Sequence, residues 1–399
     1  MAGQRRRLWP ALLAAAIAAG AATVVLRPRS GLIEPAAIEL TAYFSPAELD
    51  RAADFRDLQR VLSLAAIALS GGTLALLALR PPRVRNGALA GAGISVVLVV
   101  VGLPLAVWRH ERAVDAGLST QSLGPWLGDV AKSAGIGAFF AALGGALVIW
   151  LIRRFPARWW VPSAGVVVGF AVLTLYLSPV VIDPLFNRFE ALPKGELRSD
   201  VLRLADRAGV EVGEVYRVDA SRRTTSVNAY VGGLGHTKRV VLYDNLIEDF
   251  PPDQVRSVVA HELGHVENRD IPRGILWIAI VAPAGTFLIQ RLAERMAGDG
   301  LMGGGTKPDG RAVPAVALAF ALVSFGLTSA GNALSRPVEA RADAFALELT
   351  KDPRAFIGLE RRITIRNLGD PDPPRLMHLL FGTHPTTRER LGFGVRFGR

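Results

Sequence analysis

Residues 258–270 read VVAHELGHVENRD and place two of the chain's six histidines four residues apart, with a glutamate between them. Apolar residues recur around this stretch at helical spacing, so His261 and His265 lie one turn apart on one face of a predicted helix. Two imidazoles placed in this way can bind one zinc ion at about 2.0–2.1 Å each. Glu262 projects at a different angle, which suits a general base better than a third ligand. The same pattern also arises by chance on solvated helices, so it needs support from elsewhere in the chain.

Residues 335–347, SRPVEARADAFAL, offer a third ligand. Glu339 and Asp343 are four residues apart and share a helical face. Glu339 can bind the metal, and Asp343 can then accept a hydrogen bond from the free ring N–H of a ligand histidine. The alternative for both acids is a solvated helix face with Arg341 alongside. The chain has no cysteine, so any metal must be held by histidines and carboxylates.

Seven long apolar runs predict a polytopic membrane protein. Half of the residues are hydrophobic, and each run has about the length that crosses a hydrocarbon core as a helix. Arginines border the runs, so the excess of 46 basic over 35 acidic residues indicates contact with anionic lipid headgroups rather than nucleic acid. The predicted spans cover residues 8–26, 61–79, 87–108, 135–152, 159–181, 274–290 and 313–334.

The first run follows three arginines, as a signal peptide would. Its apolar core is long for a cleaved signal, so an uncleaved span is the favoured interpretation. Short basic loops at residues 80–85 and 153–158 favour the inside of the cell, together with the N-terminus, which would leave the segment after span five outside. The opposing loops also carry many arginines, so the charge count decides the orientation only narrowly.

Spans six and seven bring the two candidate metal-binding segments together. The helix with His261 and His265 runs almost directly into span six, and span seven runs almost directly into the segment with Glu339. Two adjacent antiparallel spans joined by one loop begin and end on the same membrane face. We therefore expect the site at or just inside the membrane boundary.

The chain predicts a mainly α fold with a small sheet. The apolar pattern of residues 197–208 predicts a helix, and SVNAYVGG and RVVLYD, joined by a glycine-rich turn, predict a β-hairpin within residues 226–244. The predicted division has four parts: five spans in residues 1–181, a region with the sheet and the HExxH helix in 182–273, a transmembrane hairpin in 274–334, and a segment with the third ligand in 335–399.

These residues resemble the type I CAAX prenyl protease family of integral-membrane zinc metallopeptidases. Five blocks match in order over roughly residues 178–391, whereas the first four spans match only in number and hydropathy. The matching blocks are DPLFNRFEALPKGELR (183–198), SRRTTSVNAYVGGLGHTKRVVLYDNL (221–246), AHELGH (260–265), SRPVEARADAFAL (335–347) and THP (383–385).

The resemblance implies a zincin-like catalytic region of the gluzincin type. It also implies seven spans that form a barrel around a large internal chamber, with the zinc at one end. His261, His265 and Glu339 correspond by position to the zinc ligands, with one Zn2+ per chain. Glu262 matches the catalytic glutamate.

The resemblance also implies roles for three further residues. Asp343 matches an acid that orients a ligand or donates a proton, and Asn228 and His384 match residues near the scissile carbonyl. A strand near Asn228 can receive an extended peptide by edge pairing. His384 precedes a proline, which favours an extended or turn conformation, and it can donate to a developing oxyanion. An ordinary loop histidine is the alternative for His384.

The predicted activity is hydrolysis of peptide bonds by an integral-membrane zinc metalloendopeptidase. Glu262 takes a proton from a zinc-activated water, which then attacks the carbonyl. The expected partners are the lipid bilayer and a peptide or membrane-protein substrate. The alternatives are a transporter that binds ions through the same cluster and a catalytically inactive scaffold. The spans are nearly free of ionisable residues, which disfavours a transporter.

The expected location is a bacterial plasma membrane, because the chain is rich in arginine, alanine and glycine. The family places its catalytic loop on the cytoplasmic side, and this outweighs the narrow arginine count. We therefore expect the catalytic region to face the cytoplasm. The sequence leaves the substrate, the cleavage rule and the oligomeric state open.

Overall fold

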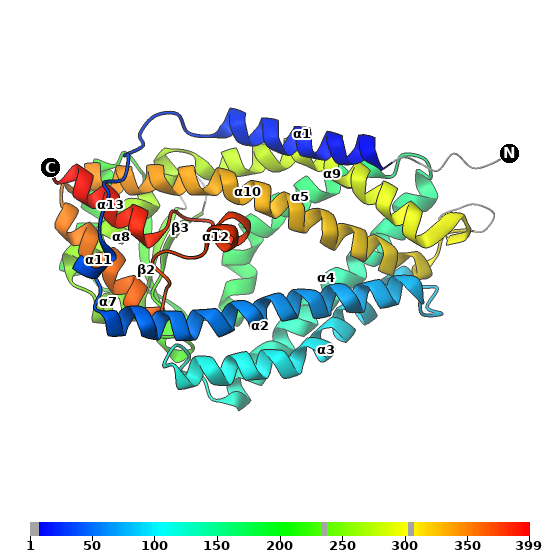
Figure 1. Ribbon diagram of the computed structural model, residues 1–399, viewed down its shortest axis with the longest axis horizontal. Helices are drawn as coiled ribbons and strands as arrows, with labels where there is room; N and C mark the ends of the chain where they lie inside the picture. The colour runs from blue at the N-terminus through cyan, green and yellow to red at the C-terminus, as the bar shows by residue number, and fades with distance from the viewer. Residues whose placement is uncertain (1–7, 234–237, 302–306) are drawn as a thin grey trace.

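The structure of the chain is a computed structural model, and it describes residues 8–233, 238–301 and 307–399. Long helices run side by side between two ends of the molecule, and the small sheet lies at the end that holds the C-terminus (Figure 1). In these described ranges, seven helices are long and apolar enough to cross a membrane. The prediction of a mainly helical membrane protein with about seven spans and a small sheet is confirmed.

Five of the spanning helices, α2, α3, α4, α9 and α10, extend beyond the predicted apolar runs. Helix α2 begins at Pro46 instead of near residue 61, because Ser45 and Glu48 form a capping box and proline suits the first helical turn. After α5, a π-helical turn and a 3-10 turn carry the fifth candidate span on to Leu185. The spanning helices are α1 (Trp9–Leu26), α2 (Pro46–Leu79), α3 (Gly87–Asp115), α4 (Leu123–Arg154), α5 (Trp160–Leu177), α9 (Asp270–Leu301) and α10 (Val313–Thr350).

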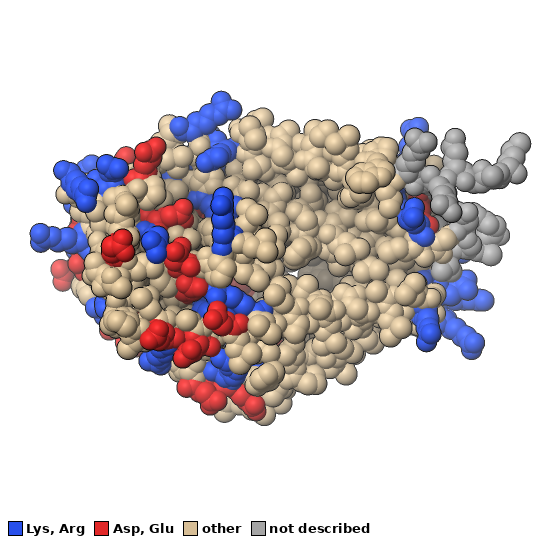
Figure 2. All heavy atoms as spheres, in the orientation of Figure 1, with Lys and Arg blue, Asp and Glu red and all other residues tan. Residues whose placement is uncertain are grey.

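One face of the molecule is nearly bare of charge in its middle (Figure 2). On the face shown in Figure 2, charged side chains gather at two ends, and the band between them is uncharged. The spanning windows bury little of their own surface inside the protein, from 0 % in the fifth span to 39 % in the sixth. Apolar side chains exposed over such an area are stable in lipid rather than in water.

Helices α3 and α4 pack closer than ordinary side chains allow. A Cβ atom added at Gly91 would lie 2.0 Å from the carbonyl oxygen of Ala141, and one added at Gly145 would lie 2.2 Å from that of Gly87. Small residues let two backbones approach in this way inside a bilayer. Close packing of the two backbones therefore stabilises this contact, which we call the α3–α4 seam.

A four-stranded mixed sheet lies beside the candidate site. Its order is β1-β2-β4-β3, with β2 and β4 parallel and the other two pairs antiparallel. Strands β3 and β4 form the predicted hairpin, although residues 234–237 of its turn lie outside the described residues. Strand β3 ends the sheet, so one of its edges has no partner strand in the described chain. The strands are β1 (Phe189–Ala191), β2 (Glu214–Val218), β3 (Ala229–Gly232) and β4 (Arg239–Tyr243).

An apolar core fixes α8 against this sheet. Val240 and Leu242 of β4 and Val259 and Leu263 of α8 are fully buried in it. Burying one such side chain stabilises the fold by roughly 1.5–3 kcal/mol, so these contacts hold one face of α8 against the sheet. The shorter helices of this end are α6 (Glu196–Arg207), α7 (Asp244–Asp249), α8 (Pro252–Glu267), α11 (Pro353–Arg366), α12 (Arg375–Phe381) and α13 (Thr387–Phe397).

Helix α10 is continuous across a predicted boundary. It runs from Val313 to Thr350, so the seventh span and the segment with Glu339 and Asp343 form one helix. The division of the chain into four parts stays a prediction.

Candidate metal centre

Helices α8 and α10 meet at Gly264. A Cβ atom at this position would lie 3.1 Å from Cδ1 of Phe345 and 3.3 Å from Cα of Ala342. A larger residue would therefore push the helices apart. The absent side chain lets α10 come close to the histidine-bearing face of α8.

Three predicted ligands converge at this contact. The ligand atoms of His261, His265 and Glu339 all lie within 4.8 Å of one another. The His261 Nε2 atom lies 3.2 Å from Glu339 Oε2 and 3.2 Å from His265 Nε2, and His265 Nε2 lies 3.5 Å from Glu339 Oε2. Ligand atoms at 2.0–2.1 Å from one tetrahedral zinc ion lie about 3.3 Å apart. The three side chains therefore fit a single zinc ion without rearrangement.

The protonation of the two rings supports the same conclusion. The Nδ1 atom of His261 lies 2.8 Å from Asp343 Oδ1, and that of His265 lies 3.0 Å from Asp270 Oδ2. A neutral imidazole carries one N–H, and a carboxylate can only accept, so each Nδ1 donates and each Nε2 keeps a lone pair. Two such lone pairs and one carboxylate oxygen of Glu339 face each other. Electron-rich groups in this arrangement repel one another unless a metal ion or protons lie between them.

Asp343 lies in the position that the spacing on α10 predicts. It is fully buried, and its partner is His261 rather than His265. Arg390 of α13 donates from Nε to Asp343 Oδ2 over 2.8 Å and also contacts Oδ1. Arg390 in turn contacts Glu360 of α11, with 2.7 Å between Nη1 and Oε2. Sequence reasoning did not single out Arg390 or Glu360, whose only signal is a charge inside an amphipathic helix.

Asp270 is a second partner that sequence reasoning missed. It is the first residue of α9, and it follows Arg269, whose positive φ of 54° turns the chain sharply after α8. The turn brings Asp270 back onto His265, and Arg273 and Arg341 hold the carboxylate from the other side. The one available signal was an acid five residues after the second histidine.

Glu262 lies beside the three predicted ligands, and no described cation contacts its carboxylate. Burial raises the pKa of its carboxyl group, and the nearby histidines act in the opposite direction. No described side chain forms a hydrogen bond or ion pair with this carboxylate. A carboxylate with a raised pKa suits a group that must accept a proton near neutral pH.

The carboxylates around the histidines also favour binding of protons. Burial lowers the pKa of His261, but hydrogen bonds with Asp343 and Glu339 outweigh it and raise the value to about 10. Burial likewise lowers the pKa of His265, while Asp270 and Glu339 raise it to about 9. A metal ion and protons therefore compete for the same Nε2 atoms.

His384 and Asn228 lie in different surroundings. The Nε2 atom of His384 lies 3.2 Å from Glu339 Oε2, so the structure brings this half-exposed histidine to the ligand cluster. Asn228 is exposed and directly precedes β3, and its carbonyl oxygen accepts a hydrogen bond from the amide of Tyr243. No described contact joins Asn228 to the histidines or to Glu339.

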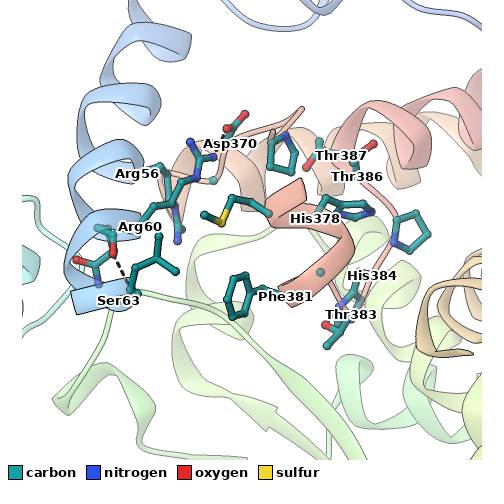
Figure 3. Close-up of a pocket in the computed structure, with 17 residues that line it drawn as sticks. Arg56, Arg60, Ser63, Asp370, His378, Phe381, Thr383, His384, Thr386 and Thr387 are labelled. Carbon is teal, nitrogen blue, oxygen red and sulfur yellow. Dashed lines mark hydrogen bonds and ion pairs between the residues drawn. The ribbon is translucent and has the colours of Figure 1, made fainter. Parts of the chain in front are cut away.

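A cavity of about 630 Å³ adjoins His384. Figure 3 shows Arg56, Arg60 and Ser63 of α2 on one side, with α12 and the segment that carries His384 on the other. Leu64, Met377 and Phe381 add apolar surface. Arg60 pairs with Asp57 and Asp370, whereas the hydrogen bonds of Arg56 go to the backbone carbonyls of residues 367 and 368. The cavity therefore combines an apolar wall with a cationic one, directly beside the cluster.

Models of two protein families match the chain. Residues 191–393 match peptidase family M48, and residues 82–188 match the CAAX prenyl protease N-terminal family, which is described by five membrane helices. The first match contains all three predicted ligands, Glu262, Asp343, Asn228 and His384.

Similar proteins and a similar fold are also known. The metalloprotease YhfN of Bacillus subtilis is 32 % identical over 302 residues, which are 75 % of this chain and 70 % of that protein. CAAX prenyl protease 1 of Saccharomyces cerevisiae is 32 % identical over 206 residues, but these are 50 % of this chain and only 44 % of the yeast protein. The crystal structure of S. mikatae Ste24p has the same fold, with a TM-score of 0.74 over 96 % of this chain and 98 % of that one, at 22 % identity.

Proposed function

The chain belongs to peptidase family M48, and we propose that His261, His265 and Glu339 hold one zinc ion at which a peptide bond is hydrolysed. It is a membrane metalloprotease of the CAAX prenyl protease and YhfN type. The observation that carries the proposal is the convergence of the Nε2 atoms of His261 and His265 on one carboxylate oxygen of Glu339, while both Nδ1 atoms lie against other carboxylates. That donor set matches zinc with an open fourth position.

The roles of the neighbouring side chains follow from their charge and position. Zinc, when bound, supplies Lewis-acid polarisation of a carbonyl and makes water a stronger acid. Glu262 accepts the proton of the attacking water and delivers it to the leaving amine. His384 lies within hydrogen-bonding distance of Glu339 and can donate to the oxygen on which negative charge develops. Asp343 holds His261 in the tautomer that leaves Nε2 free.

An extended peptide fits the surroundings of this centre. The outer edge of β3 pairs with no described strand, and a peptide strand can add to such an edge. Asn228, at the start of this strand, would then contact the bound peptide near the cleaved bond. Side chains beyond that bond enter the cavity beside His384. The substrate class is peptides or membrane proteins that reach the site from the bilayer.

Replacing Glu262 with glutamine tests the proposal. The variant keeps the size of the side chain and removes the proton acceptor, so proteolysis should fall by about 10²–10⁴-fold while zinc stays bound. Zinc content by elemental analysis and cleavage of a susceptible peptide are the two measurements. Glu248→Gln is a matched control, because that half-exposed residue pairs with Arg217 on the surface. Native turnover in the Glu262 variant would exclude the proposed base.

The chain is a multi-pass integral membrane protein. Its proposed location is a bacterial plasma membrane, with the catalytic end in the cytoplasm. The absence of cysteine permits a direct test by single-cysteine variants at Arg83 and Lys194, which are exposed at opposite ends. A membrane-impermeant maleimide should label Arg83→Cys on intact cells and Lys194→Cys only after permeabilisation. The reverse pattern would place the catalytic end outside.

A further inference from the structure

The two ligand histidines have backing clusters of opposite charge. Behind His261 lie two carboxylates, Asp343 and Glu360, and one guanidinium, Arg390. Behind His265 lie one carboxylate and two guanidinium groups. The second cluster consists of Asp270, Arg273 and Arg341. One imidazole therefore faces excess negative charge, and the other faces excess positive charge.

The negative cluster is continuous and buried. Arg390 contacts both oxygens of Asp343 and donates from Nη1 to Glu360 Oε2 over 2.7 Å. The side chains of Asp343 and Glu360 are 0 % and 4 % exposed, so water screens their charges poorly. The second oxygen of Glu360, Oε1, is buried and has no hydrogen-bond partner in the described chain. Glu360 thus brings a negative charge to the cluster at a considerable desolvation cost, and the packing of α11 alone does not require it.

The positive cluster lacks a corresponding acid. Arg273 donates to Asp270 over 2.6 Å, and Arg341 contacts the same carboxylate oxygen. No other described carboxylate contacts either guanidinium. Asp270 therefore shares its charge among two cations and His265, and it is the weaker acceptor for the imidazole N–H.

A carboxylate that accepts a hydrogen bond from Nδ1–H makes Nε2 a stronger electron-pair donor to a metal ion. A cation near that carboxylate opposes this effect. Glu360 balances the charge of Arg390 and leaves Asp343 free to act on His261. We propose that Glu360, which contacts no ligand, is a positioning residue that sets the donor strength of His261 through Arg390 and Asp343. This inference rests on the proposed zinc site.

The ionisation of Glu360 supplies a readout for its role. Burial raises the pKa of its carboxyl group to about 7 against the opposing effect of Arg390. The charged and titratable groups that act on it are Arg390 of α13, Asp343 of α10 and His261 of α8. Its negative charge is present above pH 7 and disappears below it, so zinc retention should acquire an additional step near that pH.

The test uses the full-length protein in detergent or liposomes, with Glu360→Gln as the main variant. Glutamine keeps the hydrogen bond from Arg390 and removes the charge. Zinc release to a chelator at pH 8 should accelerate by up to about tenfold, which is the lower end of the effect of outer partners. The absorption spectrum of the cobalt-substituted protein should shift, and the step near pH 7 should vanish. Glu360→Asp, which keeps the charge, should restore much of the native behaviour.

A matched control separates charge from packing. Thr364 lies on α11 one turn after Glu360, is buried, and bonds Thr387 of α13 over 2.9 Å. Thr364→Val removes a polar contact between the same two helices, so it should lower stability without changing the cobalt spectrum or zinc release. Arg341→Gln should slow zinc release, because it removes a cation from the other cluster.

Two outcomes would overturn the proposal. One is a Glu360→Gln protein whose zinc release, cobalt spectrum and pH profile equal those of the wild type. The other is a Thr364→Val protein that reproduces all the changes of Glu360→Gln. Should Glu360→Gln fail to fold, the pH profile of the wild type and the direction of the Arg341→Gln effect decide the matter, and a wild-type profile without a step near pH 7 counts against Glu360. If the zinc site itself is wrong, wild-type protein will bind no cobalt, which distinguishes the two failures.

Discussion

Two close helix contacts in the molecule depend on glycine, but different interactions stabilise them. In the α3–α4 seam, a Cβ at Gly91 or Gly145 would collide with a backbone carbonyl oxygen. In the α8–α10 seam, Gly264 meets Cα of Ala342 and the ring of Phe345, and ionisable groups of both helices surround the contact. The first seam depends on volume. The second depends on volume and charge and, in the proposed site, on a bound cation, so pH and metal should act on this seam alone.

Removal of a proposed ligand should have the largest effect, and it should affect the α8–α10 seam but not the α3–α4 seam. His261→Ala deletes one proposed zinc ligand and leaves the buried carboxylate of Asp343 without its imidazole partner. Zinc affinity and proteolysis should fall by more than the roughly 10–100-fold that outer partners typically cost. Elemental analysis and peptide cleavage measure both losses. His378→Ala is the control, because His378 lines the neighbouring cavity and should leave zinc content unchanged.

Acid should weaken only the α8–α10 seam. The pKa values of about 10 and about 9 for His261 and His265 mean that each ring carries a second proton, and a positive charge, below pH 9 when no metal is bound. Zinc must displace up to two protons, so its apparent dissociation constant should rise by up to about 100-fold for each pH unit lost below 9. Titration of the metal-free protein with zinc between pH 6 and 8 gives the slope. A dissociation constant independent of pH would contradict the protonated state of the two rings.

The partner of His265 provides a graded change in the same seam. Asp270→Asn keeps the shape of the side chain but weakens the acceptor for Nδ1–H. Zinc affinity should fall by about 10–100-fold, with a smaller effect on the unfolding midpoint of the loaded protein. Competition with a chromophoric chelator measures the affinity. Asp372→Asn, at a half-exposed surface pair with Arg388, should change nothing.

Substitutions of the glycines compare the seams directly and have the smallest expected effects on chemistry. Gly91→Val should overpack α3 against α4 and lower the free energy of unfolding by about 1–3 kcal/mol, while the folded fraction keeps its zinc and its turnover. Gly264→Ala gains up to about 1 kcal/mol of helix propensity, which offsets much of its crowding. It should therefore leave stability nearly unchanged but lower kcat several-fold, because α10 carries Glu339. Thermal unfolding and kcat are measured on both variants. Gly91→Val should change the unfolding temperature but not kcat, and Gly264→Ala should change kcat but not the unfolding temperature.

The features that could be predicted from the sequence follow from hydropathy and from the spacing of the candidate ligands. Apolar runs of spanning length predicted seven membrane helices, because lipid demands continuous apolar surface over a known thickness. The four-residue spacings predicted that His261 and His265 share a face and that Glu339 and Asp343 share another, because the α-helix has a fixed pitch. The convergence of these two faces followed from one membrane hairpin.

The remaining features depend on contacts between distant segments. The pairing of Asp343 with His261 instead of His265 follows from the relative placement of α8 and α10, which residue spacing does not specify. Asp270 reaches His265 through the left-handed turn at Arg269, a conformation that only a minority of non-glycine residues adopt. Arg390 and Glu360 come from helices whose own patterns show merely amphipathic surfaces. The predicted roles of Asn228 and His384 await the substitutions that test them.

The continuity of α10 has a mechanical consequence. Glu339 lies about 39 Å along this helix from Val313, at 1.5 Å per residue, and no loop separates it from the membrane-crossing half. A rigid tilt of about 5° around the far end would displace the Glu339 carboxylate by about 3 Å, which exceeds the tolerance of a coordination bond. Bilayers that differ in acyl-chain length should therefore alter turnover at constant zinc content, with the helix acting as a lever between lipid thickness and catalysis. Equal turnover across such bilayers would show that the neighbouring helices hold α10 at a fixed angle.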